Sequence, residues 1–472
     1  MLPVHSRRHF LRHSGAGLGT AALAHLLAEE GLAARDPMAP RASHFPAKAK
    51  NVIFLFMEGG PSQMDLYDPK PELVKWSGKP LPESLTKEYG ARLAFTKPDA
   101  AVLASPRTFR PYGQSGLEFS DYIPNIAANA DRICLVRSMY TDAFNHHPGQ
   151  LLLFSGSTQF GRPSMGAWAA YGLGSESRNL PAFVVLASGR GTSGGVTNWT
   201  SGFLPSTYQG VVFRNSGDPI LYLSNPEGLA ANTQRLTLDA LKELNEAHMA
   251  ETRDTEIDSR IASYELAFRM QSAAPELLDF STESQATLDM YGVGKQPTHP
   301  YASNCLLARR MVERGVRFVM LAHASWDDHS DLNKKLKENT AITDRPIGAL
   351  LTDLQRRGLL DSTLVVWMGE FGRTPMVEMR GGPTALENAG RDHHPFAFSM
   401  WMAGGGIKGG QVVGKTDDFA FHIAEDKIHV HDLQATIMHA LGFDHTRLTF
   451  RHLGRDFRLT DVHGNVVPKL LA

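Results

Sequence analysis

The sequence predicts an α/β fold built around a mainly parallel sheet. Three nearly continuous apolar runs support this prediction: residues 51–57 (NVIFLFM), 316–322 (VRFVMLA) and 363–368 (TLVVWM). Runs of this length without regular polar alternation are typical of strands that are covered on both faces. Amphipathic segments such as residues 301–314 and 344–357 separate the runs, so we expect helices to cover the sheet.

The first 34 residues have the features of a twin-arginine export signal. SRRHFL at residues 6–11 precedes an apolar, Gly- and Ala-rich run at residues 14–28. We therefore expect export to the periplasm or the extracellular space; the alternative is a basic tail before a short helix. No cysteine follows the run, and no other run reaches the roughly 18 apolar residues of a membrane span, so no stable membrane anchor is expected. Residues 35–50 contain three prolines and are predicted to be a linker.

Composition narrows the class of protein. The 472 residues are 42% hydrophobic, enough for a large core, and we predict a single domain over residues 51–472. The formal net charge of −1 gives no general attraction for nucleic acid, so no nucleic-acid partner is expected. The chain has two cysteines, Cys134 and Cys305. They exclude a zinc ribbon and a disulfide framework, while one disulfide remains possible.

Several segments interrupt the α/β pattern. A charged, amphipathic stretch at about 230–295 is predicted to be a helical insertion. Residues 66–118 show weak periodicity and are predicted to be irregular. Residues 188–218 are rich in Gly, Ser and Thr and are expected to form a loop that shapes a substrate site or a lid. Residues 457–467 are predicted to be a terminal hairpin that turns at His463-Gly464-Asn465.

Carboxylates and imidazoles follow the predicted strands. Asp65 comes shortly after the first run and Glu370 directly after the third, while the second leads to Asp327, Asp328 and His329. Since parallel strands end at one edge of a sheet, we expect these groups to meet there. The triplet Asp392, His393 and His394 precedes an apolar run at 396–402. To bring this triplet to the same edge, that strand must run antiparallel or the triplet must lie on a long loop.

These side chains are suited to a divalent metal. Carboxylates with imidazoles admit Zn, Mn or Fe, and an all-oxygen subset admits Ca or Mg. His146 and His147 stand at a predicted helix start, followed by Pro148. There they could hold an anion, because the helix dipole favours negative charge at that end. The alternative is an ordinary polar helix start.

The motifs in order also resemble a known family. GGPSQMDLYDPKP, NHHPGQLLLFSG, SWDDHSDL, GEFGRTP and GRDHHP follow one another within residues 50–445. This series resembles the alkaline phosphatase and sulfatase superfamily, in particular an exported bacterial sulfatase-like branch catalogued only as a domain of unknown function, family fifteen hundred and one. The resemblance implies a three-layer α/β/α sandwich with one or two metal ions at the strand ends. It implies one site at Asp65 and Glu370, and a second that uses Asp327 or Asp328, His329, and His393 or His394.

The sequence departs from the sulfatase pattern at two places. His146 stands where the resemblance expects a Cys or Ser nucleophile, and Gln150 stands at the Arg position. The Asp-His pair expected after the late strand is Glu370-Phe371. Formylglycine chemistry is therefore excluded, and hydrolysis is expected through direct attack of water or through a labile phosphohistidine.

We therefore expect an exported, metal-dependent hydrolase of sulfate or phosphate esters that uses one or two ions (Zn, Mn or Ca). The substrate would be a small molecule or a carbohydrate ester. His146 or His147 would assist proton transfer or hold the oxyanion, and Arg373 or Arg391 would pair with it. The alternative is a catalytically silent relative that keeps the metal and binds a carbohydrate or protein partner through residues 188–218.

Overall fold

The structure is a computed structural model. It describes residues 36–87, 99–188, 191–214, 219–221, 223–252, 254, 256–378 and 385–472. The predicted export signal lies outside the described residues. Within them, no helix is long and apolar enough to cross a membrane.

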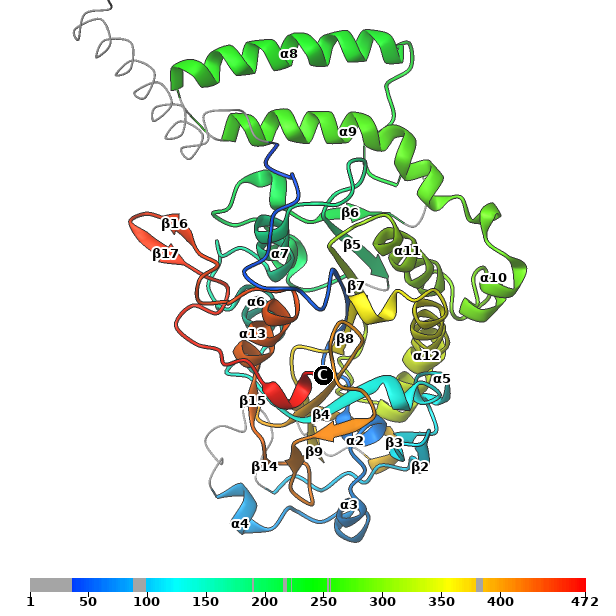
Figure 1. The fold of residues 1–472 in the computed structure, drawn as a ribbon. Coiled ribbons are helices and arrows are strands. Elements are labelled where there is room, and N and C mark those ends of the chain that lie inside the picture. The colour runs from blue at the N-terminus through cyan, green and yellow to red at the C-terminus, as the bar shows by residue number, and fades with distance from the viewer. Residues whose placement is uncertain are drawn as a thin grey trace, which may run out of the picture.

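A mixed sheet forms the middle layer (Figure 1). Its strands are β1 (Asn51–Glu58), β4 (Ile133–Tyr140), β5 (Phe183–Ser188), β6 (Val211–Phe213), β7 (Phe318–Ala324), β8 (Thr363–Met368), β11 (Phe398–Ala403), β12 (Gln411–Val413) and β15 (Ile428–His429). The order is β12-β4-β11-β8-β1-β7-β5-β6, with β15 also beside β4. The sheet is mainly parallel, as the apolar runs predict.

The three predicted strands are adjacent. β1 pairs in parallel with β7 on one side and with β8 on the other, so Leu55 lies between Leu321 and Trp367. β11 pairs antiparallel with both β8 and β4. The prediction that the strand after the histidine pair runs antiparallel is therefore confirmed.

Helices cover both faces of the sheet. α11 (Tyr301–Glu313) and α12 (Leu332–Arg356) lie on one face, and α6 (His146–Ser155), α7 (Met165–Leu173) and α13 (Val430–Ala440) on the other (Figure 1). Alternate residues of β1 serve the two layers: Leu55 packs with the α11 and α12 cluster and Phe54 with the opposite cluster. Burial on both faces explains why these strands are apolar throughout.

Two local predictions were wrong. Residues 66–118, predicted to be irregular, contain α3 (Pro71–Trp76), α4 (Glu83–Thr86) and the β2 (Phe109–Tyr112) to β3 (Leu117–Ser120) hairpin, which α5 (Pro124–Ala127) follows. Asp131 holds the hairpin turn by accepting from the backbone of Gln114 and Ser115, a contact too distant for local periodicity to reveal. The terminal hairpin consists of β16 (Phe450–His452) and β17 (Arg455–Phe457), so it ends where the predicted one was to begin.

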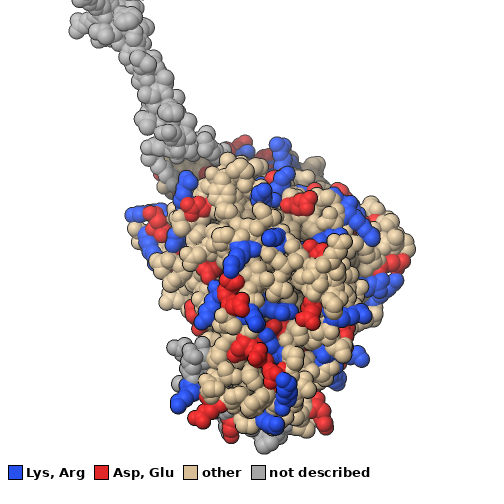
Figure 2. Space-filling model, turned by 60° about the horizontal axis from the view of Figure 1, so that its bottom comes forward, with Lys and Arg blue, Asp and Glu red and all other residues tan. Residues whose placement is uncertain are grey.

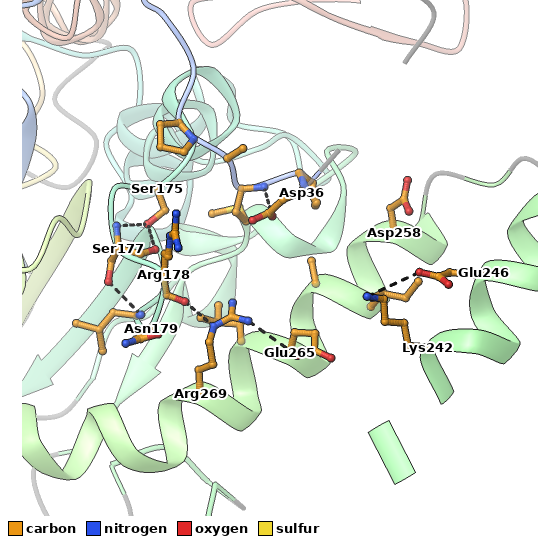
Figure 3. A pocket seen from close by; sticks show the side chains of 18 residues that line it. Asp36, Ser175, Ser177, Arg178, Asn179, Lys242, Glu246, Asp258, Glu265 and Arg269 are labelled. Carbon is orange, nitrogen blue, oxygen red and sulfur yellow. Dashed lines mark hydrogen bonds and ion pairs between the residues drawn. The ribbon is translucent and has the colours of Figure 1, made fainter. Parts of the chain in front are cut away.

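The predicted helical insertion contains α8 (Ala231–Thr252), α9 (Glu256–Leu278) and α10 (Gln285–Tyr291). α8 lies beside α9 and has no buried residue (Figure 1). A cavity of about 660 Å³ lies between these helices, the chain around Met38 and the loop at Arg178 (Figure 3). The single-domain organisation stays a prediction.

Residues 36–50, predicted to be a linker, form no helix or strand and lie against the helical layer of α7 and α13. Arg41 donates its backbone N–H to Leu173, and Lys48 and Ala49 donate theirs to Ala440. This segment is therefore fixed to the ends of α7 and α13. Cys134 and Cys305 are both buried and free, in separate core clusters. On the face shown in Figure 2, basic and acidic side chains are interspersed.

Candidate metal centre

The strands deliver their polar residues to one edge, as the parallel arrangement requires. Glu58 ends β1, Asp327 follows β7, and Glu370 lies between β8 and β9 (Gly372–Val377). β10 (Arg391–His394) pairs antiparallel with β9 and brings His393 opposite Arg373. The first turn of α6 contributes His146.

A glycine makes this close assembly possible. Gly59 has a φ of +114°, and a Cβ atom there would lie 2.4 Å from the backbone nitrogen of Asp327. Only glycine tolerates both this conformation and this approach. The turn after β1 therefore fixes where the backbone of Asp327 lies.

Three imidazole nitrogens surround one carboxylate oxygen. The Nε2 atoms of His146, His329 and His393 lie 3.3, 2.8 and 3.2 Å from Asp327 Oδ1. Ligand atoms of the four residues all lie within 4.8 Å of one another. The Asp327 side chain is 43% exposed, so the group is open to solvent on that side.

The other ring nitrogen of each histidine faces an oxygen. Nδ1 of His146 lies 2.6 Å from Glu370 Oε1, Nδ1 of His329 lies 3.1 Å from Glu378 Oε2, and Nδ1 of His393 lies 2.7 Å from the Phe144 carbonyl oxygen. In the neutral tautomer that donates from Nδ1, the Nε2 lone pair faces Asp327. Such outer contacts orient histidine ligands in metal sites.

The donor set fits a divalent cation. His146 Nε2 is buried and forms no hydrogen bond, although Asp327 Oδ1 lies 3.3 Å away. Unpartnered buried polar atoms are costly and rare in native proteins. A cation shared by three imidazoles and a carboxylate would satisfy it.

The electrostatics of the group also favour positive charge. Although burial opposes it, contacts with His146, His329 and His393 hold the pKa of Asp327 far below its usual range. Burial lowers the pKa of His146, but its contacts with the Asp327 and Glu370 carboxylates outweigh burial and raise that pKa to about 9. The carboxylates therefore stabilise a proton on His146, and a metal cation would compete with that proton for the same position.

Two further ligand groups adjoin the first. Glu58, His146 and Glu370 form one, and His329, Glu378 and Asp392 form the other. Each shares a histidine with the four-residue group. Sequence reasoning did not include Glu58 or Glu378 among the site residues. Glu58 is marked by its position at the end of an apolar run, whereas no local signal marks Glu378.

Three predicted ligands lie outside these groups. Within the described residues, the three ligand groups do not include Asp65, Asp328 or His394. Arg391 Nε lies 3.1 Å from Asp65 Oδ2, and both side chains are fully buried. Burial raises the pKa of Asp328 to about 7. The His394 ring stacks on Phe421 and its Nε2 lies 2.9 Å from the Phe421 carbonyl oxygen.

The predicted arginines are buried within protein contacts. The Arg373 guanidinium lies 2.6 Å from Asp327 Oδ1 and donates to the carbonyl oxygens of Gly60 and Arg391. Arg391 donates to Asp65 and to the Thr374 carbonyl oxygen. Both guanidinium groups therefore stabilise the buried side of the site.

The remaining predicted residue, His147, faces a different loop. Its Nε2 lies 3.3 Å from Thr197 Oγ1, in the η2 turn (Gly195–Trp199). Gln150 ties that loop to the centre: its amide nitrogen donates to Glu58 and Ser193, and its oxygen accepts from Asn198. Gln150, at the expected Arg position, therefore connects the carboxylates of Glu58 and Glu370 to the predicted substrate loop.

Comparisons with known proteins place this geometry in context. The family model described as "Protein of unknown function (DUF1501)" matches residues 49–471. No curated protein matches the chain.

Solved structures give distant similarities. The PsFucS1 sulfatase from Pseudoalteromonas sp. is 12% identical, with a TM-score of 0.36 and coverage of 91% of this chain and 71% of that one. A protein in the alkaline phosphatase superfamily from Vibrio parahaemolyticus is 11% identical, with a TM-score of 0.36 and coverage of 86% and 70%. The alkaline phosphatase from the Antarctic bacterium TAB5 is 10% identical, with a TM-score of 0.29 and coverage of 76% and 92%. These values indicate only distant similarity.

Proposed function

The chain belongs to the family described as proteins of unknown function, DUF1501, and from that premise we propose that it is an exported, metal-dependent hydrolase of sulfate or phosphate esters. The observation that carries the proposal is the convergence of three histidine Nε2 atoms on Asp327 Oδ1. The proposed substrate is a small-molecule or carbohydrate ester.

We assign the ion to His146, Asp327, His329 and His393. Three imidazoles and one carboxylate favour Zn or Mn over Ca, because Ca prefers oxygen ligands. Glu58 and Glu370 lie beside His146 and could contribute oxygen ligands to a second ion. A bound divalent ion supplies Lewis acidity that polarises an ester oxygen and lowers the pKa of water.

Protein residues would position the ligands and transfer protons. Arg373 positions Asp327 from its buried side, and Glu370 orients His146. His147 stands outside the ligand group at the start of α6, beside the Gly195–Trp199 turn. We assign it the transfer of a proton to or from the ester, or contact with the oxyanion.

Covalent catalysis by serine in the α6 motif has no structural support. Ser155 Oγ donates to the Leu151 carbonyl oxygen at 2.8 Å, at the far end of the helix. His146, at the expected nucleophile position, has a carboxylate beside each ring nitrogen. Direct attack by water on the ester is therefore the route that we propose.

The test combines metal analysis with activity. Protein purified without added metal should contain a transition metal and should hydrolyse at least one of three substrate classes: aryl sulfates, phosphate monoesters and phosphate diesters. The His329→Ala/His393→Ala double variant should lose both metal and turnover. His248→Ala, an exposed histidine on α8, is the matched control. Unchanged metal content in the double variant would refute the ligand assignment.

One observation favours a second candidate. Each ring nitrogen of His146 lies beside a carboxylate, so neither is free to act as a nucleophile, as expected for a silent relative that keeps its metal. Such a protein would bind a carbohydrate or protein partner through residues 188–218. Bound metal without turnover of any of the three substrate classes would favour this candidate.

A further inference from the structure

A second polar cavity lies at the same sheet edge as the metal centre. It has a volume of about 330 Å³, and its lining includes Tyr140, His429, His431, His463 and Asn465. Tyr140 ends β4, and His429 ends β15, which runs parallel to β4. Because β4 is parallel to β8, both residues lie at the edge where β8 ends. Two strand spacings, about 10 Å, separate β4 from β8.

One chain segment connects the two places. Asp142 Oδ2 lies 3.1 Å from His429 Nε2. Two residues later the Phe144 carbonyl oxygen contacts His393, and His146 follows at the start of α6. A ligand in the cavity would therefore lie beside the segment that carries a metal ligand.

The cavity is a built structure rather than a surface hollow. Asp432 Oδ2 accepts from the His429 backbone at the start of α13, and Oδ1 accepts from the Asn465 backbone, which holds the 463–465 turn in place. Gly464 has a φ of +88°, and a Cβ atom there would lie 2.8 Å from the His431 carbonyl oxygen. The turn thus requires glycine in order to close on α13.

One buried polar atom in the cavity forms no hydrogen bond. His429 is 9% exposed, and its Nε2 is buried in a geometry that forms no hydrogen bond, despite its proximity to Asp142. Its Nδ1 accepts from the His431 backbone, so the neutral ring carries its proton on Nε2. The Nε2–H therefore lies in the cavity lining near Asp142 without a formed hydrogen bond, and a ligand oxygen there would accept it.

The charges argue against an anion. Burial lowers the pKa of both His429 and His431, so these rings are neutral near pH 7. Asp142 and Asp432 add negative charge beside them. A phosphate or sulfate group would meet neutral imidazoles and two carboxylates, which would repel it.

The ring geometry argues against a metal. The His431 and His463 rings are stacked, with centroids 4.9 Å apart and planes 16° apart. Stacked rings place their nitrogens side by side instead of around one point. Within the described residues, the groups able to surround an ion do not include this cluster.

A neutral, polyhydroxylated ligand fits what remains. Tyr140 and His463 contribute aromatic rings to the lining, and the imidazole, amide and carboxylate groups there offer both donors and acceptors. We propose that this cavity is a saccharide subsite, which holds a sugar ring next to the one whose ester lies at the metal centre. This inference rests on the proposed function for the ester, and it assigns the substrate class as an oligosaccharide sulfate or phosphate.

Binding can be tested apart from turnover. The full-length mature protein is applied to an array of neutral, carboxylated and sulfated oligosaccharides, with Tyr140→Ala and His463→Ala as variants and His248→Ala as the matched control. We expect retention of oligosaccharides by the unmodified protein and the control, and at least a tenfold loss in both variants. Metal content and thermal unfolding of each variant establish that it is folded; His463 is exposed, so its variant tests the site should Tyr140→Ala fail to fold.

The outcomes separate the two proposals. Failure of every oligosaccharide to bind, or equal binding by His463→Ala and the unmodified protein, would overturn the subsite. Oligosaccharide binding that depends on His463, without hydrolysis of any ester, would uphold the subsite and overturn the hydrolase. If esters are hydrolysed, KM for an oligosaccharide ester should rise at least tenfold in His463→Ala relative to KM for an aryl ester.

Discussion

His329 Nδ1 lies 3.1 Å from Glu378 Oε2, and the opposite nitrogen of the same ring lies 2.8 Å from Asp327. Glu378 thus fixes which nitrogen of His329 faces the candidate ion. The relationship is typical of metal sites, in which a carboxylate orients an imidazole and increases its basicity. It also identifies a residue whose role can be measured without knowledge of the substrate.

Glu378→Gln should weaken metal binding about 10- to 100-fold, because the amide cannot accept from Nδ1 as strongly as a carboxylate. Titration of the metal-free protein with Zn²⁺ or Mn²⁺ measures the change. The exposed Glu425→Gln variant is the control. Equal affinities in the two variants would show that Glu378 does not orient a ligand.

The two histidines at the start of α6 should differ sharply. His146 has both nitrogens beside carboxylates of the candidate centre, whereas His147 contacts Thr197. His146→Ala should therefore lower the bound metal, and His147→Ala should retain it. Elemental analysis of both purified variants decides the matter, and parallel losses would place His147 among the ligands.

Gly59→Ala should lower the metal content by more than the cost of its positive φ alone would cause. The new Cβ would lie 2.4 Å from the Asp327 backbone, in addition to the cost of a positive φ. Gly161 also has a positive φ, but no atom lies within 4 Å of a Cβ built there. Gly161→Ala thus isolates the conformational cost. We expect loss of metal only in Gly59→Ala; similar behaviour of both variants in metal analysis would argue against the steric account.

The buried pair of Asp65 and Arg391 should be structural. Arg391→Met leaves a buried carboxylate without its partner and should lower the free energy of unfolding by about 3–5 kcal/mol. Adding Asp65→Asn should recover part of that loss. Arg451, in an exposed pair with Asp456, is the control and should cost less than about 1 kcal/mol on mutation to Met. Chemical denaturation measures these three variants and the Asp65→Asn single variant, and additive losses in the double variant would exclude coupling.

His323 should make stability depend on pH. Burial lowers its pKa from 6.5 to about 4. Between these pH values the unfolded chain binds a proton that the folded protein does not. The contribution of neutral His323 to the free energy of unfolding is therefore complete above pH 6.5 and is lost as the pH falls to about 4. The loss is about 3 kcal/mol, at 1.36 kcal/mol per pKa unit.

Urea unfolding of metal-free protein at pH 7 and pH 4.5 provides the measurement. His323→Gln removes the titrating group, so its stability should fall less between these two conditions than that of the unmodified protein. Equal losses would show that His323 does not remain neutral in the fold.

The sequence by itself determined the α/β class, the three central strands and the edge at which the site lies. Long apolar runs can be buried only between two layers, and the carboxyl ends of parallel strands meet at one edge. The meeting of Asp327, His329 and Glu370 at this edge could therefore be predicted from their positions after the strands, whereas His146 was predicted as a catalytic residue at a helix start.

Only the tertiary structure decided which member of each adjacent pair faces the centre. Successive side chains of extended backbone point in opposite directions, so Asp327 rather than Asp328, and His393 rather than His394, depends on how the chain enters the site. Glu378 and the His429 cavity come from segments that meet only through the packing of β9 with β10 and of β15 with β4. No local pattern of residues encodes those meetings, because they depend on contacts between distant parts of the chain.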